Sequence, residues 1–486
     1  MAHTSRFVLL PTRGFTADLP LTSSDTSDFL LSMASGGEWR ATTAARSPRM
    51  TVLDSIHGNG AKLVALSDVA LVRLKREQPG LRVVPEVFYP PAQAPRPRPL
   101  IGVQAFSARV DLARKRVRIV FQGSGKPVRD VDVIAFTDFA ARRGASAKTN
   151  AKGEVRLDLP PETRRLERIY LYPAHGAWPM LLENWPLDDG LIQLAPIDSG
   201  FVDSRIKAYP KRAPGDGAGV TVGVIDTGVG PHAALRVAGG LNTVTGEDPA
   251  DWSDSHDHGT HVAGILAGRG AGFRGVASGV SLRAYRVFGK NADGASSFAI
   301  AKAIDRAVAD GCDLLNLSLG GGPDDPTTGE AIKAARAKGV VCVVAAGNDG
   351  GAVSWPGKHP LVMAVSALGY EGLWPAGSMQ SACVQPPPGK NRCFIADFSN
   401  TGAEIDLTGP GVGVVSCIPH DRFGVMDGTS MACPAVTGAI ARRLAADLTV
   451  LQMARDGERS DAIVKLGLTA ARDMGLPPYL QGAGLA

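Results

Sequence analysis

From about residue 199 onwards, short apolar runs alternate with amphipathic segments, and this alternation constrains the fold more than any other feature of the chain. The apolar runs have the length of buried strands and read "GVTVGVID", "VSLRAYRVF", "DLLNLSL", "VVCVVAA" and "LVMAVSAL". Segments of helical periodicity lie between them, among them "HGTHVAGILAG", "SSFAIAKAIDRAVADG" and "GEAIKAARAKG". Buried strands separated by helices predict an α/β fold, in which helices cover both faces of a mostly parallel sheet.

The residues before this region predict two smaller units. Residues 1–99 contain a strand, a helix that starts near Ser67, a Pro-Gly turn and another strand, which indicates a small α+β domain. Its last residues, "PPAQAPRPRP", favour a stiff, extended linker. Residues 100–198 contain "VRIVFQG", "VDVIAF" and "EVRLDL" with turn residues between them, which predicts a small β-sandwich. We therefore expect three domains, the third spanning 199–486.

Composition argues against two classes of partner. The 52 Lys and Arg are nearly balanced by 47 Asp and Glu and are scattered, so we expect no nucleic-acid partner. No stretch approaches the roughly 20 apolar residues of a membrane span, so we expect no membrane partner. The N-terminal run "FVLL" is too short for the core of a signal peptide. The sequence as given predicts a cytoplasmic protein, or a secreted one if a leader was removed.

The cysteines are too few to form a disulfide framework in a chain of this length. Four of them have apolar or small neighbours and are expected to pack as small hydrophobic residues: Cys312, Cys342, Cys417 and Cys433. Cys383 and Cys393 flank the loop "VQPPPGKNR" and form the one plausible bridge, although a cytosolic location argues against it.

Four polar residues fall at the ends of predicted elements. Asp226 ends a strand in "VGVIDTG", and Asn348 follows another in "VVAAGNDG". His258 and Ser430 each open a predicted helix. In a parallel sheet, catalytic groups collect beyond the carboxyl ends of the strands. A carboxylate, an imidazole, a hydroxyl and a carboxamide are together the groups that acyl transfer through a serine requires.

Each of these groups has a distinct chemical part to play. A serine hydroxyl such as that of Ser430 is a weak nucleophile until a base, here His258, removes its proton. Asp226 would hold the imidazole tautomer and stabilise the imidazolium. The Asn348 side chain and the Ser430 backbone N–H could stabilise the oxyanion of the tetrahedral intermediate.

The same residues also have simpler interpretations. Ser430 could merely cap a helix, and Asn348 could merely form a turn. His256, His258 and His261 could suggest a metal site, but no nearby ligands complete it, and His261 is better explained as a packed structural histidine. A further two acidic residues, Asp254 and Asp257, are expected to be solvated.

The motifs "VIDTG", "HGTHVAG", "AAGN" and "GTSMACP", in this order, resemble those of the subtilases, the subtilisin-like serine proteases. The resemblance covers about residues 202–486. It implies a serine endopeptidase whose protein or peptide substrate lies as an extra strand between two backbone segments. The residues that the resemblance assigns to these segments are Ser318, Leu319 and Gly320 on one side and Ala292, Asp293 and Gly294 on the other.

The resemblance also implies a specificity pocket, and it indicates whether a cofactor is to be expected. The pocket would use Ala345, Ala346 and Gly347 together with Ser354, which stands where relatives often have Gly and would make the pocket shallower or more polar. Asp349 and Asp293 suggest basic substrate residues. The loop "AGRGAGFRG" is short for a tight calcium site, so we expect no cofactor for catalysis, and calcium is not indicated. The segment from Gly369 to Ser399 is long and could rim the cleft or be a plain surface excursion.

The region from about Gly60 to Tyr89 resembles the inhibitory propeptide of subtilases, and the second domain is similar to carboxypeptidase regulatory-like domains. The N-terminal region would thus be a partner of the catalytic domain. Pro90 makes cleavage after Tyr89 unfavourable. We therefore expect maturation between Leu187 and Lys207, or a three-domain protease that is never cut. Two other possibilities are a dedicated peptide-maturing or transpeptidating enzyme on the same fold and an inactive binding protein.

Overall fold

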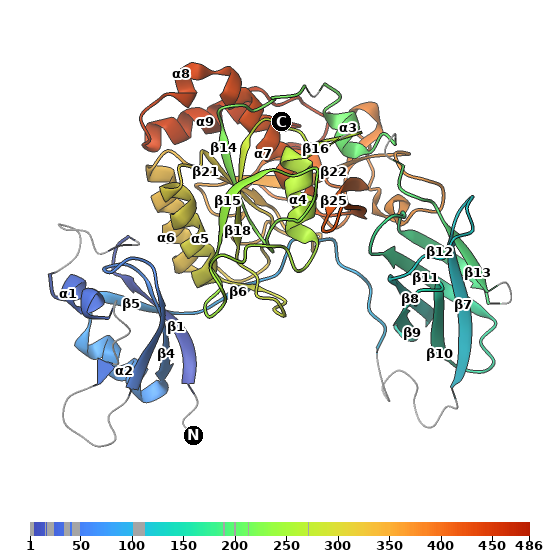
Figure 1. Cartoon of the computed structure of the whole chain (residues 1–486), viewed down its shortest axis with the longest axis horizontal. Coiled ribbons are helices and arrows are strands. Elements are labelled where there is room, and N and C mark those ends of the chain that lie inside the picture. Colours follow the sequence, from blue (N-terminus) through green and yellow to red (C-terminus); the bar gives the residue numbers. More distant parts are fainter. Residues whose placement is uncertain are drawn as a thin grey trace.

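The computed structural model describes residues 4–14, 16, 24–33, 39–40, 49–100, 112–187, 190–198, 201–211, 213–270 and 272–486. Three units follow one another across the molecule (Figure 1). A small unit containing the N-terminus lies at one end, a large α/β unit lies in the middle, and a unit built from strands lies at the other end.

A mostly parallel sheet forms the framework of the large unit, as predicted from its apolar runs. Its strands are β14 (Thr221–Asp226), β15 (Val237–Asn242), β18 (Ser281–Arg286), β20 (Leu314–Leu317), β21 (Val341–Ala345), β22 (Met363–Tyr370), β23 (Cys393–Ile395) and β24 (Ile405–Pro410). The order is β15-β18-β14-β20-β21-β22-β23, and β24 also pairs with β22. All of these pairs are parallel except β22 with β23.

Helices cover both faces of this sheet. On one face lie α4 (His258–Ala267) and α7 (Thr429–Ala446), and on the other lie α5 (Ser297–Ala309) and α6 (Pro326–Ala337). Neighbouring residues of β14 show the alternation, because Val224 packs in the α4–α7 core and Ile225 packs in the α5–α6 core.

Shorter elements surround this framework. They are α3 (Ser204–Ala208), β16 (Arg269–Gly270), β17 (Phe273–Arg274), β19 (Ala295–Ser296), η1 (Met379–Cys383), η2 (Lys390–Arg392), β25 (Val414–Ile418), β26 (Arg422–Met426), α8 (Leu448–Leu451), α9 (Gly457–Thr469) and α10 (Pro478–Gln481).

The N-terminal unit is a five-stranded antiparallel sheet with two helices. Its elements are β1 (Thr4–Pro11), α1 (Ser24–Ser32), β2 (Trp39–Arg40), β3 (Arg49–Ser55), β4 (Lys62–Ser67), α2 (Asp68–Glu77) and β5 (Leu81–Pro85), with sheet order β2-β3-β4-β1-β5. The Ser67 hydroxyl accepts the backbone N–H of Ala70 at 3.3 Å and so caps α2, where the sequence predicts a helix start.

The second small unit consists of two sheets that share one apolar core. One sheet has the order β10-β7-β13 and the other β12-β11-β8-β9. The strands are β7 (Ala113–Phe121), β8 (Val131–Asp138), β9 (Arg143–Lys148), β10 (Glu154–Leu159), β11 (Arg165–Pro173), β12 (Met180–Pro186) and β13 (Leu191–Leu194). We call this unit, residues 112–198 as described, the β-sandwich; the exact domain limits stay a prediction.

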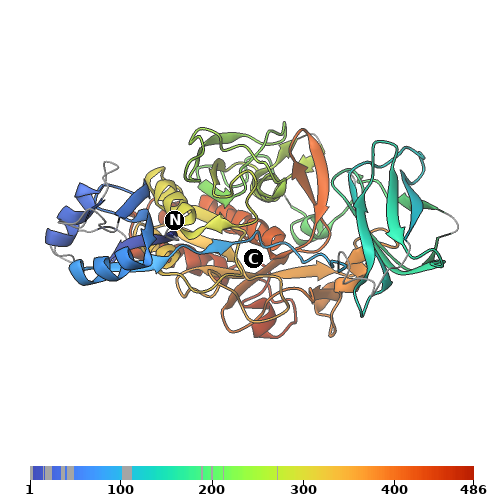
Figure 2. The same cartoon turned by 90° about the horizontal axis from the view of Figure 1, so that it is seen from below.

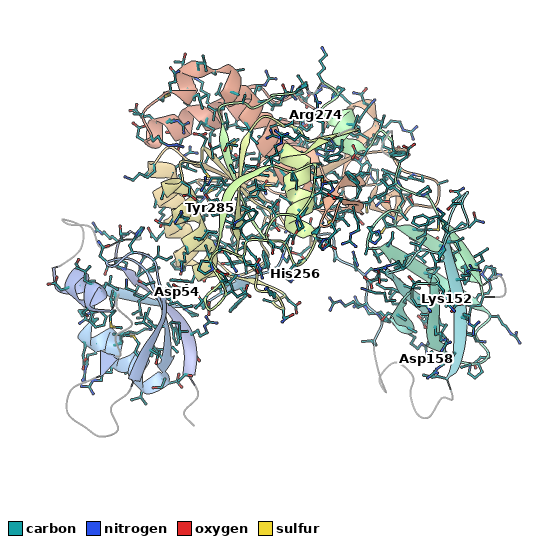
Figure 3. The ribbon with its side chains drawn as sticks, in the orientation of Figure 1. Asp54, Lys152, Asp158, His256, Arg274 and Tyr285 are labelled. Atoms are coloured by element: carbon teal, nitrogen blue, oxygen red, sulfur yellow. The ribbon has the colours of Figure 1, made fainter. Side chains whose placement is uncertain are left out.

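The N-terminal unit packs on α5 and α6. Asp54 forms an ion pair of 2.8 Å with Lys302 of α5 and accepts a hydrogen bond of 2.9 Å from the Thr245 hydroxyl. Figure 3 labels Asp54 at this junction. Val8 and Leu63 belong to the same buried apolar cluster as residues of α5 and α6, so the contact is a true packing interface.

The long segment between β22 and β23 contacts the β-sandwich. The Leu181 N–H donates to the Gly377 carbonyl at 3.2 Å, and the Met379 N–H donates to the Pro179 carbonyl at 3.4 Å. The segment is therefore more than a surface excursion, because it joins the β-sandwich to the α/β unit.

The bridge between Cys383 and Cys393 does not form in the structure. Both thiols are free and buried, like those of the other four cysteines. Cys393 Sγ lies 3.6 Å from the Met474 carbonyl oxygen, and the Cys383 carbonyl accepts the Asp397 N–H at 3.1 Å. The bridge that the sequence leaves open is therefore not formed in the structure.

Among the residues that the structure describes, no helix combines the length and the apolar character needed to cross a bilayer.

Arg459 of α9 is fully buried and joins three elements. Its guanidinium donates to Asp313 at 2.7 Å and to the Gly339 carbonyl at 2.6 Å, while Asp313 also accepts the Thr221 N–H at 2.8 Å.

Arg459→Leu should lower the free energy of unfolding by about 3 kcal/mol, because it leaves a buried carboxylate and carbonyl short of a donor. Denaturant unfolding followed by circular dichroism measures the loss. Arg455→Leu, the matched change at the half-exposed second partner of Asp313, should cost under about 1 kcal/mol. Equal losses in the two variants would contradict the assignment.

Candidate active site

Asp226 and His258 form a buried pair at the carboxyl end of the sheet. Asp226 is the last residue of β14, and His258 is the first residue of α4. His258 Nδ1 lies 2.7 Å from Asp226 Oδ1, and both side chains are only 1% exposed. The Thr227 N–H also donates to this carboxylate oxygen at 2.7 Å. These contacts fix the imidazole with Nδ1 toward the carboxylate and Nε2 on the opposite side.

A glycine after the histidine allows α4 to approach β14. A Cβ atom at Gly259 would lie 2.1 Å from the Gly228 carbonyl oxygen and 3.1 Å from the Asp226 side chain. Any side chain here would push His258 away from Asp226. The "HG" pair of the motif is therefore a packing requirement of this junction.

Asp254 is not the solvated residue that the sequence suggests. One carboxylate oxygen accepts the Thr227 hydroxyl at 2.8 Å, and the other accepts the Thr260 N–H at 2.8 Å. Thr227 in turn accepts the Gly259 N–H at 2.8 Å. Burial raises the pKa of Asp254, although these hydrogen bonds oppose the rise. Asp254 thus holds the start of α4 against the end of β14, and the expectation is corrected.

His261 is a packed structural histidine, one helical turn after His258. Its Nε2 lies 3.1 Å from the carbonyl oxygen of Val414 and 3.3 Å from that of Gly424. Burial lowers the pKa of His261 to about 3, so the ring is neutral at ordinary pH. Among the described ranges, no group of three His, Cys, Asp or Glu side chains could hold a metal ion.

Ser430 is the second residue of α7 and is fully buried. Its hydroxyl donates to the Ser318 carbonyl at 3.0 Å, and the Ser318 hydroxyl donates back to the Ser430 carbonyl at 3.0 Å. In the part of the chain that the structure describes, His258 Nε2 has no hydrogen-bond partner. The hydroxyl is therefore turned away from the imidazole in this conformation. Catalytic hydrogen bonds often tighten only in the reacting complex.

Asn348 follows β21 and is oriented by the residue before Ser430. Its Oδ1 accepts the Thr429 N–H at 2.8 Å and the Thr429 hydroxyl at 3.1 Å. Because Thr429 occupies Oδ1, the NH₂ end of the carboxamide is the end that can donate to another group. The Ser430 N–H and this amide are the two donors that the sequence predicts for an oxyanion.

The chain's own residues 88–94 lie as a strand in the groove beside Ser430. Strand β6 (Phe88–Tyr89) pairs antiparallel with β19. On the other side, the Gly320 N–H donates to the Pro90 carbonyl at 3.2 Å, and the Ala92 N–H donates to the Ser318 carbonyl at 3.1 Å. Figure 2 shows this segment crossing the underside of the α/β unit on its way to the β-sandwich.

The peptide bond between Ala92 and Gln93 lies at Ser430. The Ser430 N–H donates to the Ala92 carbonyl at 3.2 Å, and the Ala94 N–H donates to the Asp427 carbonyl at 3.0 Å. A Cβ atom at Gly428 would lie 2.7 Å from the Ala92 oxygen, so only glycine allows this approach. The segment that lies across Ser430 thus comes from residues 88–94 and not from the stretch between Leu187 and Lys207, where maturation is predicted.

One predicted edge of the groove is displaced. Ser318, Leu319 and Gly320 contact the segment, since Leu319 bridges to Pro91. The opposite pairing uses Ala295 and Ser296 rather than Ala292, Asp293 and Gly294. The Ala292 N–H donates to the Gly289 carbonyl at 3.2 Å in a turn, so the strand begins only at Ala295. Gly294 still lies close to the segment.

The predicted pocket residues meet beside the same groove. The Ser354 hydroxyl donates to the Ala346 carbonyl at 3.1 Å. A Cβ atom at Gly347 would lie 2.5 Å from the Ser354 Oγ, so glycine is needed here as well. Ser354 Oγ also lies close to Gly320, which places these residues at one wall of the groove.

A peptide strand held in register beside a buried Asp–His pair and a helix-opening serine defines a class of protein, the serine proteases. Residues 217–483 match the sequence profile of the Subtilase family. The chain belongs to this family.

Curated relatives agree with the family match. Subtilisin DY of Bacillus licheniformis is 39% identical over 245 residues, which cover 49% of this chain and 81% of the relative. Subtilisin Savinase of Lederbergia lenta is 36% identical over 242 residues, with the same two coverages. The thermostable alkaline protease of Halalkalibacterium halodurans is 34% identical over 252 residues, which cover 51% of this chain and 62% of the relative. The chain is a subtilisin-like serine endopeptidase by homology of its α/β unit.

The sequence motifs do not point to the segment 88–94. Its contacts use backbone atoms of Pro90 and Ala92, which leave no side-chain pattern to recognise. The available signal was the extended "FYPPA" that directly follows the propeptide-like strand, with a small residue three positions beyond Tyr89.

Asp427, which lies next to the site, makes the stability of the folded state depend on pH. Its carboxylate accepts the Gly413 N–H at 2.7 Å and the Gln380 side-chain N–H at 2.9 Å, and burial raises its pKa to about 6. Because the folded pKa exceeds the unfolded value of about 4, the folded state retains a proton that the unfolded state releases. Stability from this group is therefore present below about pH 4 and is lost as pH rises to about 6.

Asp427→Asn removes this titration. The thermal unfolding midpoint of the wild type, relative to that of the variant, should fall between pH 4 and pH 6 and stay constant above pH 7. Calorimetry across this range, with Ser430 replaced by Ala in both proteins, checks the trend. A relative midpoint that rises with pH would show that the folded pKa is depressed instead.

Proposed function

We propose that the chain is a serine endopeptidase made as a self-inhibited zymogen, which cleaves its own peptide bond between Ala92 and Gln93. The observation that carries this proposal is the Ala92 carbonyl on the Ser430 N–H, next to the Asp226–His258 pair. The segment occupies the groove as a substrate would, with main-chain hydrogen bonds on both sides.

The reaction follows from this arrangement. The Ser430 hydroxyl turns from the Ser318 carbonyl to His258 Nε2 and attacks the Ala92 carbonyl carbon while Nε2 takes the proton. The oxyanion receives hydrogen bonds from the Ser430 N–H and from the Asn348 amide. His258 then protonates the Gln93 nitrogen, the peptide bond breaks, and Ala92 remains as an ester of Ser430. Water, deprotonated by His258, hydrolyses the ester and regenerates the serine. Asp226 orients the imidazole and stabilises its charged form throughout.

The occupant of the groove also suggests the substrate class. A small residue, Ala92, precedes the reacting bond beside the wall that Ser354 forms. Three residues earlier, Tyr89 is fully buried, with its hydroxyl on the Pro323 carbonyl at 3.0 Å. Substrates with a small residue before the cut and an aromatic residue three positions earlier fit this site. Asp349 and Asp293, from which the sequence suggests basic substrate residues, are both exposed.

The N-terminal unit acts as the inhibitory propeptide in this account. It packs on α5 and α6 and feeds β6 into the groove. Catalysis by the four proposed groups requires no cofactor.

Replacing the nucleophile should abolish self-processing. Intact mass followed over time should show the wild type separating into residues 1–92 and 93–486, while Ser430→Ala stays whole. The matched control Ser318→Ala keeps the nucleophile and should still process. A first cut anywhere between Leu187 and Lys207 would overturn the assigned bond, and cleavage of Ser430→Ala at the wild-type rate would overturn the nucleophile.

Removing the oxyanion amide should slow the chemical step. Asn348→Leu keeps the side-chain volume and should lower kcat by about 10²–10³, a figure that comes from subtilisin itself, with KM little changed. The substrate is a quenched peptide with the sequence of residues 89–96, given to processed enzyme. A variant that raises KM and leaves kcat intact would assign Asn348 to substrate binding instead.

A further inference from the structure

Beyond the reacting bond, the segment leaves the α/β unit and continues onto the β-sandwich. Ala94 still bonds to the α/β unit, because its N–H donates to the Asp427 carbonyl. Arg96, four residues after the reacting carbonyl, forms its ion pair and its ring contact with residues of the β-sandwich. Its guanidinium carbon lies 4.4 Å from the centre of the Tyr172 ring, and its Nη1 lies 3.1 Å from Asp132 Oδ2.

The surroundings of Arg96 suit a cation. The Tyr172 side chain is largely buried and stacks on Tyr170, with ring centres 6.3 Å apart and planes within 5°. Asp132 supplies a carboxylate that also pairs with Lys148 at 3.4 Å. Asp397 and Asp427 line a recess of about 550 Å³ next to Arg96 and Tyr172. An aromatic face with carboxylates beside it attracts a guanidinium by cation–π and ionic contacts together.

The β-sandwich holds this surface in a fixed place relative to Ser430. Trp178 is buried and packs edge-on against Phe201, with ring centres 4.9 Å apart. The Gly176 N–H donates to the Phe423 carbonyl of β26 at 2.9 Å. The hydrogen bonds from Leu181 to Gly377 and from Met379 to Pro179 attach the β-sandwich to the α/β unit at a second place. A fixed platform can act as part of a binding site, whereas a tethered domain cannot.

We infer that the β-sandwich extends the substrate groove on the leaving-group side, and that Tyr172 and Asp132 form a subsite for an arginine four residues after the cut bond. This inference rests on the proposed function, because it takes Arg96 as the occupant seen when the chain is its own substrate. It gives the β-sandwich a role in choosing peptides, and it names a basic residue as the feature it selects.

Self-processing tests the subsite with the chain as it exists. Arg96→Glu should slow cleavage at Ala92–Gln93 roughly five- to twentyfold, the sum of a cation–π contact and a half-exposed ion pair. Arg98→Glu is the matched control, since Arg98 is exposed in the same segment, and it should process at the wild-type rate. Asp132→Asn changes a partly exposed side chain of the β-sandwich and should slow processing about two- to fivefold.

Peptides in trans separate substrate choice from folding. Processed wild type receives quenched peptides with the sequence of residues 88–98, either unchanged or with Glu at the position of Arg96 or Arg98. The peptide altered at Arg96 should lose roughly five- to twentyfold in kcat/KM, and the one altered at Arg98 should lose little. The chain's own residues 93–98 compete equally with all three peptides, so the ratios are preserved. In the Tyr172→Leu enzyme, the ratio of kcat/KM between the unchanged peptide and the peptide altered at Arg96 should be smaller than in the wild type.

A short chromogenic substrate that ends at the alanine of Tyr-Pro-Pro-Ala gives the remaining control, because it has no residues on the leaving-group side. The Arg96→Glu, Asp132→Asn and Tyr172→Leu enzymes should cleave it at the same rate as the wild type after processing. If the wild type cleaves neither this substrate nor itself, the proposed function fails. If it cleaves both but handles the Arg96- and Arg98-altered peptides alike, the serine protease stands and the subsite is overturned.

Discussion

The structure depends on a strand that the chain inserts into its own groove. Pro90 and Ala92 hydrogen-bond to Gly320 and Ser318, and β6 pairs with β19. These main-chain contacts join all three units, because the N-terminal sheet precedes the strand and the β-sandwich follows it. The same contacts cover Ser430 and place one particular peptide bond against it. In the proposed zymogen, inhibition and self-recognition are thus two consequences of a single pairing.

The α/β framework supplies the precision that this pairing needs. Glycine at 259 lets α4 approach β14, so that His258 reaches Asp226, and glycine at 428 lets the Ala92 carbonyl reach the start of α7. The Asp254 carboxylate then accepts the Thr260 N–H and so holds the first turn of α4 in place. Close backbone approach and buried hydrogen bonds, rather than the catalytic side chains alone, set the distances in the site.

Much of this framework could be predicted from the sequence. The strands read as continuous apolar runs because both faces are buried, and Asp226 and Asn348 stood out as polar residues where such runs end. Asp254 could not be predicted, because its partners Thr227 and Thr260 belong to different elements that meet only after folding. The sequence does not predict the segment that occupies the groove either, because backbone hydrogen bonds do not depend on residue type. Pro90 argues against cleavage after Tyr89, and no side-chain pattern marks the bond three residues further on.

A crystal structure of the uncleaved Ser430→Ala protein tests the central claim most directly. The account predicts continuous density for residues 88–96 in the groove, with the Ala92 carbonyl oxygen about 3 Å from the backbone nitrogen of residue 430. An empty groove, or a different stretch of the chain lying across residue 430, would contradict it.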